Sequence, residues 1–288
     1  MIRNWRREDG QIADEHKSFR QNVIKWTNHG ITRPDLCFMW VEKSAVTGCI
    51  AFSADNRDSV NILDFSLSPG SHIGAELIRQ SNSLQRVCYH LYNDSERYGE
   101  YKQCFINAGF IAAQEKLSYR FTKKSIADTP DGVVFRTYAD AGEQVFIEAV
   151  AAVTRQTLDR ADADSVAVYG EYKAAEILVN DLKELDFQPD IWTLAYDNNR
   201  FIGLVIPSNF GDSYGGINYI GVAPEERGRG YVNALLVKGT QLLLAQGVTA
   251  IIADIDVLNY PMKSALENNG YVFECEETVL EKRPSGGI

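Results

Sequence analysis

The sequence lacks the features that mark a membrane, secreted or nucleic-acid-binding protein. It has no apolar run of the length that spans a bilayer, and its basic N-terminus has no apolar core of the kind that signal peptides carry. It also lacks an excess of basic residues, because 29 lysines and arginines face 39 aspartates and glutamates, for a formal net charge of -10. Since nucleic acid and anionic membranes both favour a basic surface, we expect neither as a partner.

Cysteine and histidine are scarce, and their spacing predicts no site. The five cysteines form no C-x-x-C pair and their number is odd, so we expect free thiols in a reducing, cytoplasmic setting. The four histidines show no metal-ligand spacing with one another or with cysteine. The sequence therefore predicts no metal site.

What the chain does have is length for two domains and a repeated order of elements. Its 288 residues are enough for two sizeable cores. Both halves run from a helix through a hairpin, a strand and a Pro/Gly turn to a helix, a strand, a short helix and a last strand. They also share the similar fragments Asn107–Phe110 and Asn268–Tyr271. We predict a tandem repeat of one α/β unit at residues 1–124 and 133–288, with the polar segment 125–132 as linker.

Periodicity and turn residues place the elements of both halves. In the first half they predict helices at 11–30 and 95–108, a turn into a helix at 67–78, and strands at 37–42, 46–53, 60–66, 85–92 and 110–121. In the second half they predict helices at 142–158, 165–185, 231–246 and 259–269, and strands at 133–138, 191–196, 200–207, 217–222, 249–256, 271–276 and 279–282. The Gly- and Ser-rich segment 209–216 is predicted as a loop.

One stretch of the second half combines a strand, a loop rich in glycine and arginine, and a helix. Residues 217–222 are mostly β-branched and aromatic, Pro224 ends the strand, and the sequence R-G-R-G at 227–230 precedes an apolar helical run. Glycines let a backbone approach a ligand closely, and the free N–H groups at a helix start point at an anion. Because Arg227 and Arg229 add positive charge, the stretch predicts a phosphate-binding site.

Two motifs in this half resemble the GNAT superfamily of N-acetyltransferases. The first runs from Val222 through Pro224 to Gly230, as V-A-P-E-E-R-G-R-G. The second is Asn259 after the next strand, followed by Met262 and by the G-Y pair at 270–271. The resemblance covers about residues 217–271 closely and the rest of the chain weakly. It implies two mixed, twisted sheets flanked by helices, in tandem, with a degenerate N-terminal unit.

The same resemblance implies a reaction and a set of site residues. Acetyl-CoA would be the co-substrate and a primary amine of a small molecule or peptide the acceptor, joined by direct attack in a ternary complex of a monomer or homodimer. The pantetheine arm would pair with the strand at Ile220, Gly221 and Val222, whose last N–H would also stabilise the oxyanion. The pyrophosphate would lie on the loop formed by Arg227, Gly228, Arg229, Gly230, Tyr231 and Val232, and the Asn259 side chain would bind the pantetheine arm.

Two positions depart from the family pattern. Val232 stands where the loop ordinarily ends in glycine or alanine, which crowds the site but leaves the backbone N–H in place. Leu266 stands where many members carry a tyrosine that protonates the departing CoA thiolate. Since leucine cannot donate a proton, we expect another group or water to do so, or the thiolate to leave unprotonated, as a thiol of pKa about 8.5 allows.

The residues that would handle the acceptor are less defined by the sequence. Asp254 and Asp256 lie two apart on a strand and so share a face, just before Asn259. They are candidates for binding or deprotonating an ammonium group, although a hydrogen-bonded pair at a strand end is an equal alternative. Tyr219 is a further candidate beside the catalytic backbone position, with sheet packing as its alternative.

Other interpretations of the glycine-rich loop are weaker. A dinucleotide-binding G-x-G-x-x-G would need glycine at Asn233, and no G-K-S/T follows for a phosphate-binding P-loop. The first half has Ser68–Gly74 in place of the arginine-containing loop, so we expect it to bind CoA poorly and to shape the acceptor cleft. A protein of another class also fits, namely an acyl-CoA sensor that binds without transferring the acyl group because Leu266 replaces the acid.

Overall fold

In the computed structural model, residues 2–4, 16–43, 45–54, 59–70, 72–80, 86–129 and 132–283 are described. The elements of the first part are β1 (Ile2–Asn4), α1 (Lys17–Asn28), η2 (Pro34–Leu36), β2 (Cys37–Glu42), β3 (Ala45–Phe52), β4 (Ser59–Leu67), α2 (Gly74–Ile78), β5 (Arg86–Tyr92), α3 (Tyr98–Asn107) and β6 (Ile111–Phe121). The elements of the second part are β7 (Val133–Thr137), α4 (Tyr138–Ala141), α5 (Glu143–Thr154), α6 (Arg160–Tyr169), α7 (Glu171–Asp186), β8 (Thr193–Asp197), β9 (Arg200–Gly211), β10 (Tyr214–Val222), η4 (Pro224–Glu226), α8 (Tyr231–Ala245), β11 (Ala250–Asp256), α9 (Tyr260–Asn268) and β12 (Val272–Lys282).

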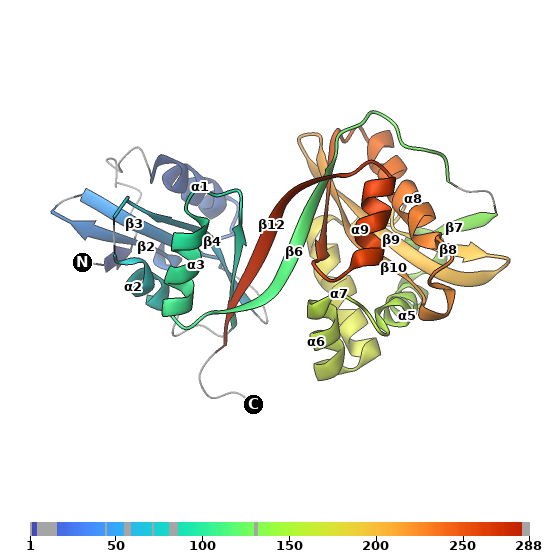
Figure 1. The fold of residues 1–288 in the computed structure, drawn as a ribbon, viewed down its shortest axis with the longest axis horizontal. Coiled ribbons are helices and arrows are strands. Elements are labelled where there is room, and N and C mark those ends of the chain that lie inside the picture. Colours follow the sequence, from blue (N-terminus) through green and yellow to red (C-terminus); the bar gives the residue numbers. More distant parts are fainter. Residues whose placement is uncertain are drawn as a thin grey trace. The chain divides into compact units, whose positions relative to one another are not determined.

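The chain forms two compact units, and strands β6 and β12 are divided between them. Unit 1 comprises Met1–Glu115 and Glu277–Ile288, and unit 2 comprises Lys116–Glu276. The second part of β6 pairs with β11 in unit 2, whereas the second part of β12 pairs with β5 in unit 1 (Figure 1). The predicted segments 1–124 and 133–288 therefore differ from the units, because the last strand of each segment completes the sheet of the other. Residues 130 and 131 of the predicted linker lie outside the described residues.

Unit 1 has a sheet in the order β1-β2-β3-β4-β5-β12. Its strands are antiparallel except for β4 and β5, which run parallel. One face of this sheet carries the side chains of α1, among them the fully buried Phe19 and Val23. The other face packs against α2 and α3 through an aromatic cluster that includes Phe65, Tyr89 and Phe105.

Unit 2 has a mixed sheet in the order β6-β11-β10-β9-β8-β7, in which only β10 and β11 run parallel. Helices α8 and α9 cover one face, where Leu235 and Leu236 of α8 meet Ile251 and Ile255 of β11. Helices α5 and α7 cover the other face and pack on β8, β9 and Tyr219 of β10 (Figure 1). Because the two faces carry separate apolar clusters, β10 is held from both sides.

Two sequence predictions in unit 2 are wrong. The predicted helix at 165–185 is two helices, since α6 begins earlier behind its N-cap Asp159 and ends at Gly170, whose φ of 78° interrupts the helical backbone. The predicted loop at 209–216 is instead the turn of a hairpin. Asp212 and Ser213 take φ values of 48° and 63°, and β9 and β10 pair up to this turn.

The remaining predicted elements are confirmed within a few residues, apart from two details. The strands predicted at 271–276 and 279–282 are one strand, β12. The first residues of the helix predicted at 11–30, positions 11–15, lie outside the described residues. Among the helices that the structure describes, none has the length and apolar character to cross a bilayer.

Candidate active site

The parallel pair β10–β11 separates partway along its length. Its register joins Tyr214, Gly215 and Gly216 to residues 250–252 and extends no further. The pairing of β10 with β9 shifts between Ile217 and Tyr219, which marks a bulge at the point where β10 leaves β11. Residues 217–222 thus have β9 on one side and no ladder to β11 on the other.

The backbone groups of Val222 and Ile220 are directed into this gap. The N–H of Ala223 donates to the carbonyl of Ile202 of β9 at 2.9 Å, so these two residues stand at a hydrogen-bonded position of the ladder. Hydrogen-bonded and non-bonded pairs alternate along an antiparallel ladder, and Val222 and Ile220 are the non-bonded positions in this register. Their N–H groups therefore point away from β9 and are available to a ligand in the gap.

The loop after β10 forms an anion cradle of backbone atoms. Gly228 and Gly230 have φ values of 78° and 80°, a conformation that other residues adopt only at a cost. A Cβ atom at Gly228 would meet no protein atom within 4 Å, and one at Gly230 only the Asn233 amide at 3.9 Å. Helix α8 begins at Tyr231, so its first N–H groups are free of helical partners. This arrangement fits a pyrophosphate.

The Arg227 side chain is hydrogen-bonded to backbone carbonyls of the chain. The guanidinium donates to the carbonyls of Val153, Arg155 and Gln156 at 2.8–3.0 Å and to the carbonyl of Val222 at 3.1 Å. Three of these carbonyls lie at the C-terminal end of α5, where a cation is favoured. Burial lowers the pKa of Arg227 from its ordinary value. These hydrogen bonds join the loop to α5.

Arg229 is exposed. It forms an ion pair with Glu226 at 2.9 Å, and Glu226 is also approached by Arg200 at 3.4 Å. The Tyr231 hydroxyl donates to Asp197 at 2.6 Å, which fixes the first residue of α8. Val232, the departure from the family pattern, packs partly buried against the core on the α8 side, so its side chain leaves the cradle open.

The two candidate carboxylates of β11 share a face, as predicted, but differ in their surroundings. Asp256 is buried, accepts from the N–H of Leu258 at 2.9 Å and shapes the turn into α9. Asp254 lies opposite Ser118 of β6, and its Oδ1 is buried without a hydrogen-bond partner. Asp256 therefore has a structural role, whereas Asp254 retains an open acceptor.

Asn259 and Leu266 lie on either side of the first turns of α9. The Asn259 Oδ1 accepts from the N–H of Met262 at 3.3 Å and so caps the helix, which leaves its amide group as the donor for a ligand. Leu266 is fully buried in the apolar cluster under α8 and α9. The position therefore contributes packing and no proton donor.

A pair that the sequence did not identify lies on the opposite face of β10. The Tyr219 hydroxyl donates to the Asp162 carboxylate on α6 at 3.0 Å. Burial, followed by the charge of Asp159, raises the pKa of Asp162 from 3.8 to about 7, against opposing contributions from Tyr219 and Lys116. Burial raises the pKa of Tyr219 well above its usual range. The sequence named Tyr219 and placed Asp162 outside any helix, and the only signal for α6 was Asp159 three residues before Asp162, a spacing typical of an N-cap.

Comparison with known proteins agrees with this geometry. The model of the acetyltransferase (GNAT) family matches residues 156–271, which include β10, the glycine-rich loop and α9. This part of the chain is similar to the GNAT acetyltransferase family and is called the GNAT domain below. An acetyltransferase of Photorhabdus laumondii is 27% identical over 101 residues, a match that spans 35% of this chain and 64% of that protein.

The fold of the whole chain is that of solved GNAT structures. A GCN5-related N-acetyltransferase from Sphaerobacter thermophilus superposes with a TM-score of 0.70 at 15% identity, over 100% of this chain and 96% of the other. A tandem GNAT protein from the clavulanic acid biosynthesis pathway superposes with a TM-score of 0.60 at 10% identity, over 100% of this chain and 99% of the other. At these identities the similarity establishes the mixed-sheet, tandem fold alone.

Unit 1 repeats the backbone geometry of the GNAT domain. Its parallel strands β4 and β5 pair only at Ser59–Asn61. Leu67 ends β4 opposite Gly48, as Val222 ends β10 opposite Gly203. The N–H of Ser68 donates to the carbonyl of Thr47 at 2.9 Å, so the same alternation directs the backbone of Leu67 into the gap beside β5.

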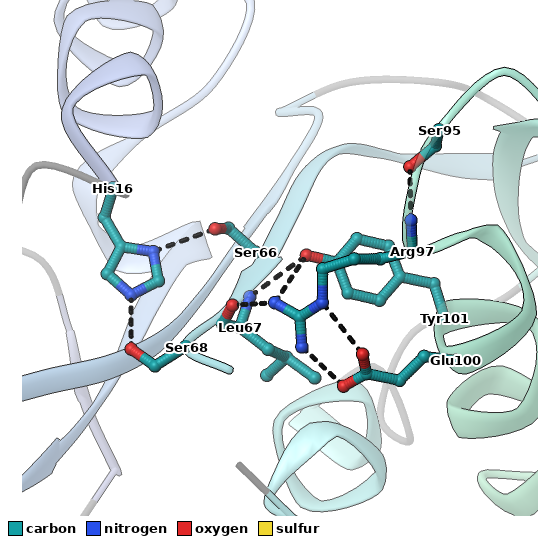
Figure 2. A network of polar contacts seen from close by, with 8 residues as sticks. All are labelled: His16, Ser66, Leu67, Ser68, Ser95, Arg97, Glu100 and Tyr101. Atoms are coloured by element: carbon teal, nitrogen blue, oxygen red, sulfur yellow. Dashed lines mark hydrogen bonds and ion pairs between the residues drawn. The ribbon is translucent and has the colours of Figure 1, made fainter. Parts of the chain in front are cut away.

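In unit 1, however, side chains of unit 1 itself form hydrogen bonds with the backbone of Leu67. The N–H of Leu67 donates to the Tyr101 hydroxyl at 3.3 Å, and its carbonyl accepts from Arg97. Figure 2 shows Arg97 and Tyr101 of the α3 region directed at Leu67, with His16 bound to Ser66 and Ser68 on either side. Counted back from the glycine after each short helix, Met262 occupies the position of Tyr101 in the GNAT domain. The second unit therefore lacks this hydroxyl and leaves Val222 accessible.

Proposed function

We propose that the protein is a cytoplasmic N-acetyltransferase that transfers the acetyl group of acetyl-CoA to a primary amine within a ternary complex. The family match supports acyl transfer as the general activity. The acyl donor, the amine and the direct attack are inferred from the geometry of unit 2.

The observation that carries the proposal is the free backbone of β10 next to the cradle of the following loop. The pantetheine arm would pair with Ile220 and Val222 as an added strand, and the N–H of Val222 would stabilise the oxyanion of the tetrahedral intermediate. The pyrophosphate would accept from the backbone at residues 228–232, beside the start of α8. Unit 1 offers neither group, because Leu67 is already bound and its loop lacks the arginines.

The test compares two glycines of matched backbone conformation, one in each unit. Gly228 and Gly70 have φ values of 78° and 74°, and a Cβ at either would meet no protein atom within 4 Å. Changing either to alanine therefore costs a similar strain, on the order of 1–2 kcal/mol. In calorimetric titration with acetyl-CoA, we expect Gly228→Ala to raise the Kd at least about tenfold and Gly70→Ala to leave it unchanged. Equal losses in both variants would contradict a site confined to unit 2.

Catalysis is tested separately from binding. Thiol release from acetyl-CoA is measured with a lysine peptide, spermidine and glucosamine as acceptors. Release with at least one amine supports the transferase. Binding of acetyl-CoA without release on any of them would favour the acyl-CoA sensor, for which the burial of Leu266 at the usual acid position is the structural argument.

A further inference from the structure

The face of β10 that carries Tyr219 holds a chain of groups suited to moving a proton. Tyr219 precedes Val222 by three residues, which is about 10 Å along an extended strand. Its side chain lies on the face covered by α5 and α7, opposite to the face of α8 and α9. Tyr219 is partly exposed as a residue, and its hydroxyl lies beside α6, where burial raises its pKa.

The geometry points to a proton relay from the acceptor ammonium through the Tyr219 hydroxyl to the Asp162 carboxylate. The inference rests on the proposed function, since the proton comes from the amine that is acetylated. The hydroxyl donates its hydrogen to Oδ2 of Asp162 at 3.0 Å, and its oxygen keeps lone pairs that can accept from an N–H. No rearrangement of this pair is needed to receive a proton.

The step balances within the pair. An ammonium has no lone pair and must lose one proton before its nitrogen can attack. Its N–H bond breaks as an O–H bond forms on Tyr219, while the original tyrosine proton passes to Asp162. The products are a neutral amine, a neutral tyrosine and a protonated carboxyl. The second proton, released as the amide forms, leaves with the CoA sulfur.

The surroundings of Asp162 adapt it to this step. Asp159 caps α6 by accepting from the N–H of Asp162 at 3.1 Å, which fixes the backbone that presents the carboxylate. The charged and titratable groups that act on the pair are Asp159 on α6, Lys116 on β6 and Arg227 after β10. Burial outweighs the favourable charge of Lys116, so the pKa of Asp162 is raised to about 7. A base of this strength is effective near its own pKa.

The other carboxylates of unit 2 are less suited to receive the proton. Asp256 is committed to the turn before α9. Asp254 lies on the same face of the sheet as Asp256, opposite Ser118 of β6. Its Oδ1 has no hydrogen-bond partner and can bind a cationic acceptor. The carboxylate that accepts the hydrogen bond of the Tyr219 hydroxyl is that of Asp162.

The experiment uses Asp162→Asn and Tyr219→Phe, with Asp164→Asn as the matched control. Asp164 lies two residues further along the same helix and is exposed. Acetyl-CoA binding is measured first by calorimetry, and we expect all three variants to bind as the wild type does. Thiol release with the amine panel is then followed from about pH 5.5 to about pH 9. For the wild type, kcat/KM should rise with pH through a midpoint near the pKa of Asp162.

The relay predicts that Asp162→Asn lowers kcat at least about 100-fold and abolishes this acidic limb, whereas Asp164→Asn changes neither. Tyr219→Phe should give a similar loss of kcat. The double variant should be no slower than either single variant, because both substitutions interrupt the same proton relay. A retained acidic limb in Asp162→Asn, or losses that multiply in the double variant, would overturn the relay while leaving the transferase intact. Failure of the wild type to bind acetyl-CoA or release thiol would overturn the proposed function and the relay with it.

Discussion

Replacing Asp162 by asparagine should stabilise the protein at alkaline pH. Folding raises the pKa of this carboxyl from 3.8 to about 7, chiefly through burial. Ionisation of Asp162 therefore costs more free energy in the folded protein than in the unfolded chain. The stability that comes from the raised pKa is complete below about pH 4 and is lost as the pH rises through about 7. Asparagine has the same shape, carries no charge at any pH and can still accept from the Tyr219 hydroxyl.

The size of the effect follows from the shift. About three pKa units at 1.36 kcal/mol each set a ceiling near 4 kcal/mol. Part of the shift comes from Asp159, and the side chain is only partly buried, so solvent reduces the penalty. We expect Asp162→Asn to gain about 1–2 kcal/mol at pH 8, or about 3–6 °C in the unfolding midpoint of a domain of this size.

The assay is thermal unfolding of the full chain at about pH 4 and about pH 8. The variant and the wild type should unfold together at the acidic pH and diverge at the alkaline one, whereas Asp164→Asn should follow the wild type at both. An equal difference at the two pH values, or a lower midpoint for Asp162→Asn at pH 8, would refute the reasoning that burial of the charge raises this pKa.

Three further predictions concern the loop, the short helix and the stoichiometry. Arg227→Gln should lower the stability by about 2 kcal/mol, because it removes the hydrogen bonds to the end of α5, whereas Arg229→Gln should change it by less than about 0.5 kcal/mol in denaturant titration. Leu266→Tyr should destabilise by about 1–3 kcal/mol and leave thiol release no faster, because the position is fully buried; a faster release would show that a hydroxyl there can reach the thiolate. Calorimetry should give one acetyl-CoA per chain, and a value of two would contradict the occupied backbone of Leu67.

The sequence was sufficient for the parts of the site that depend on local chemistry. A strand, a proline, two glycines and a helix start follow one another along the chain, so β10 from Ile217 onward, its loop and α8 were predicted almost as they stand. The function of Arg227 was not predictable in the same way. Its guanidinium binds carbonyls 71–74 residues earlier in the chain. A short sequence motif does not predict contacts between residues so far apart.

Asp162 was missed for a related reason. Helical periodicity placed one helix over 165–185, and the break at Gly170 depends on a backbone conformation that the alternation of apolar residues does not reveal. The raised pKa of Asp162 comes from burial and from the charge of Asp159, and the hydrogen-bond partner of its carboxylate is a tyrosine 57 residues away. The hairpin at Asp212 and Ser213 was also missed, because that turn uses neither the Asn-Gly nor the Asp-Gly pair that predicts such turns.

The placement of β12 has a consequence for the order in which the chain folds during synthesis. Its pairing with β5 joins Val87 to Lys282, a separation of almost 200 residues by register. The residues of unit 1 that come first from the ribosome therefore wait for the last strand before their sheet is complete, and β5 has an unpaired edge until then. At a synthesis rate of about 5–20 residues per second, that interval is on the order of 10–40 seconds. The Tyr101 and Arg97 contacts to Leu67 need only residues made early, so they can hold the separated end of β4 during that time.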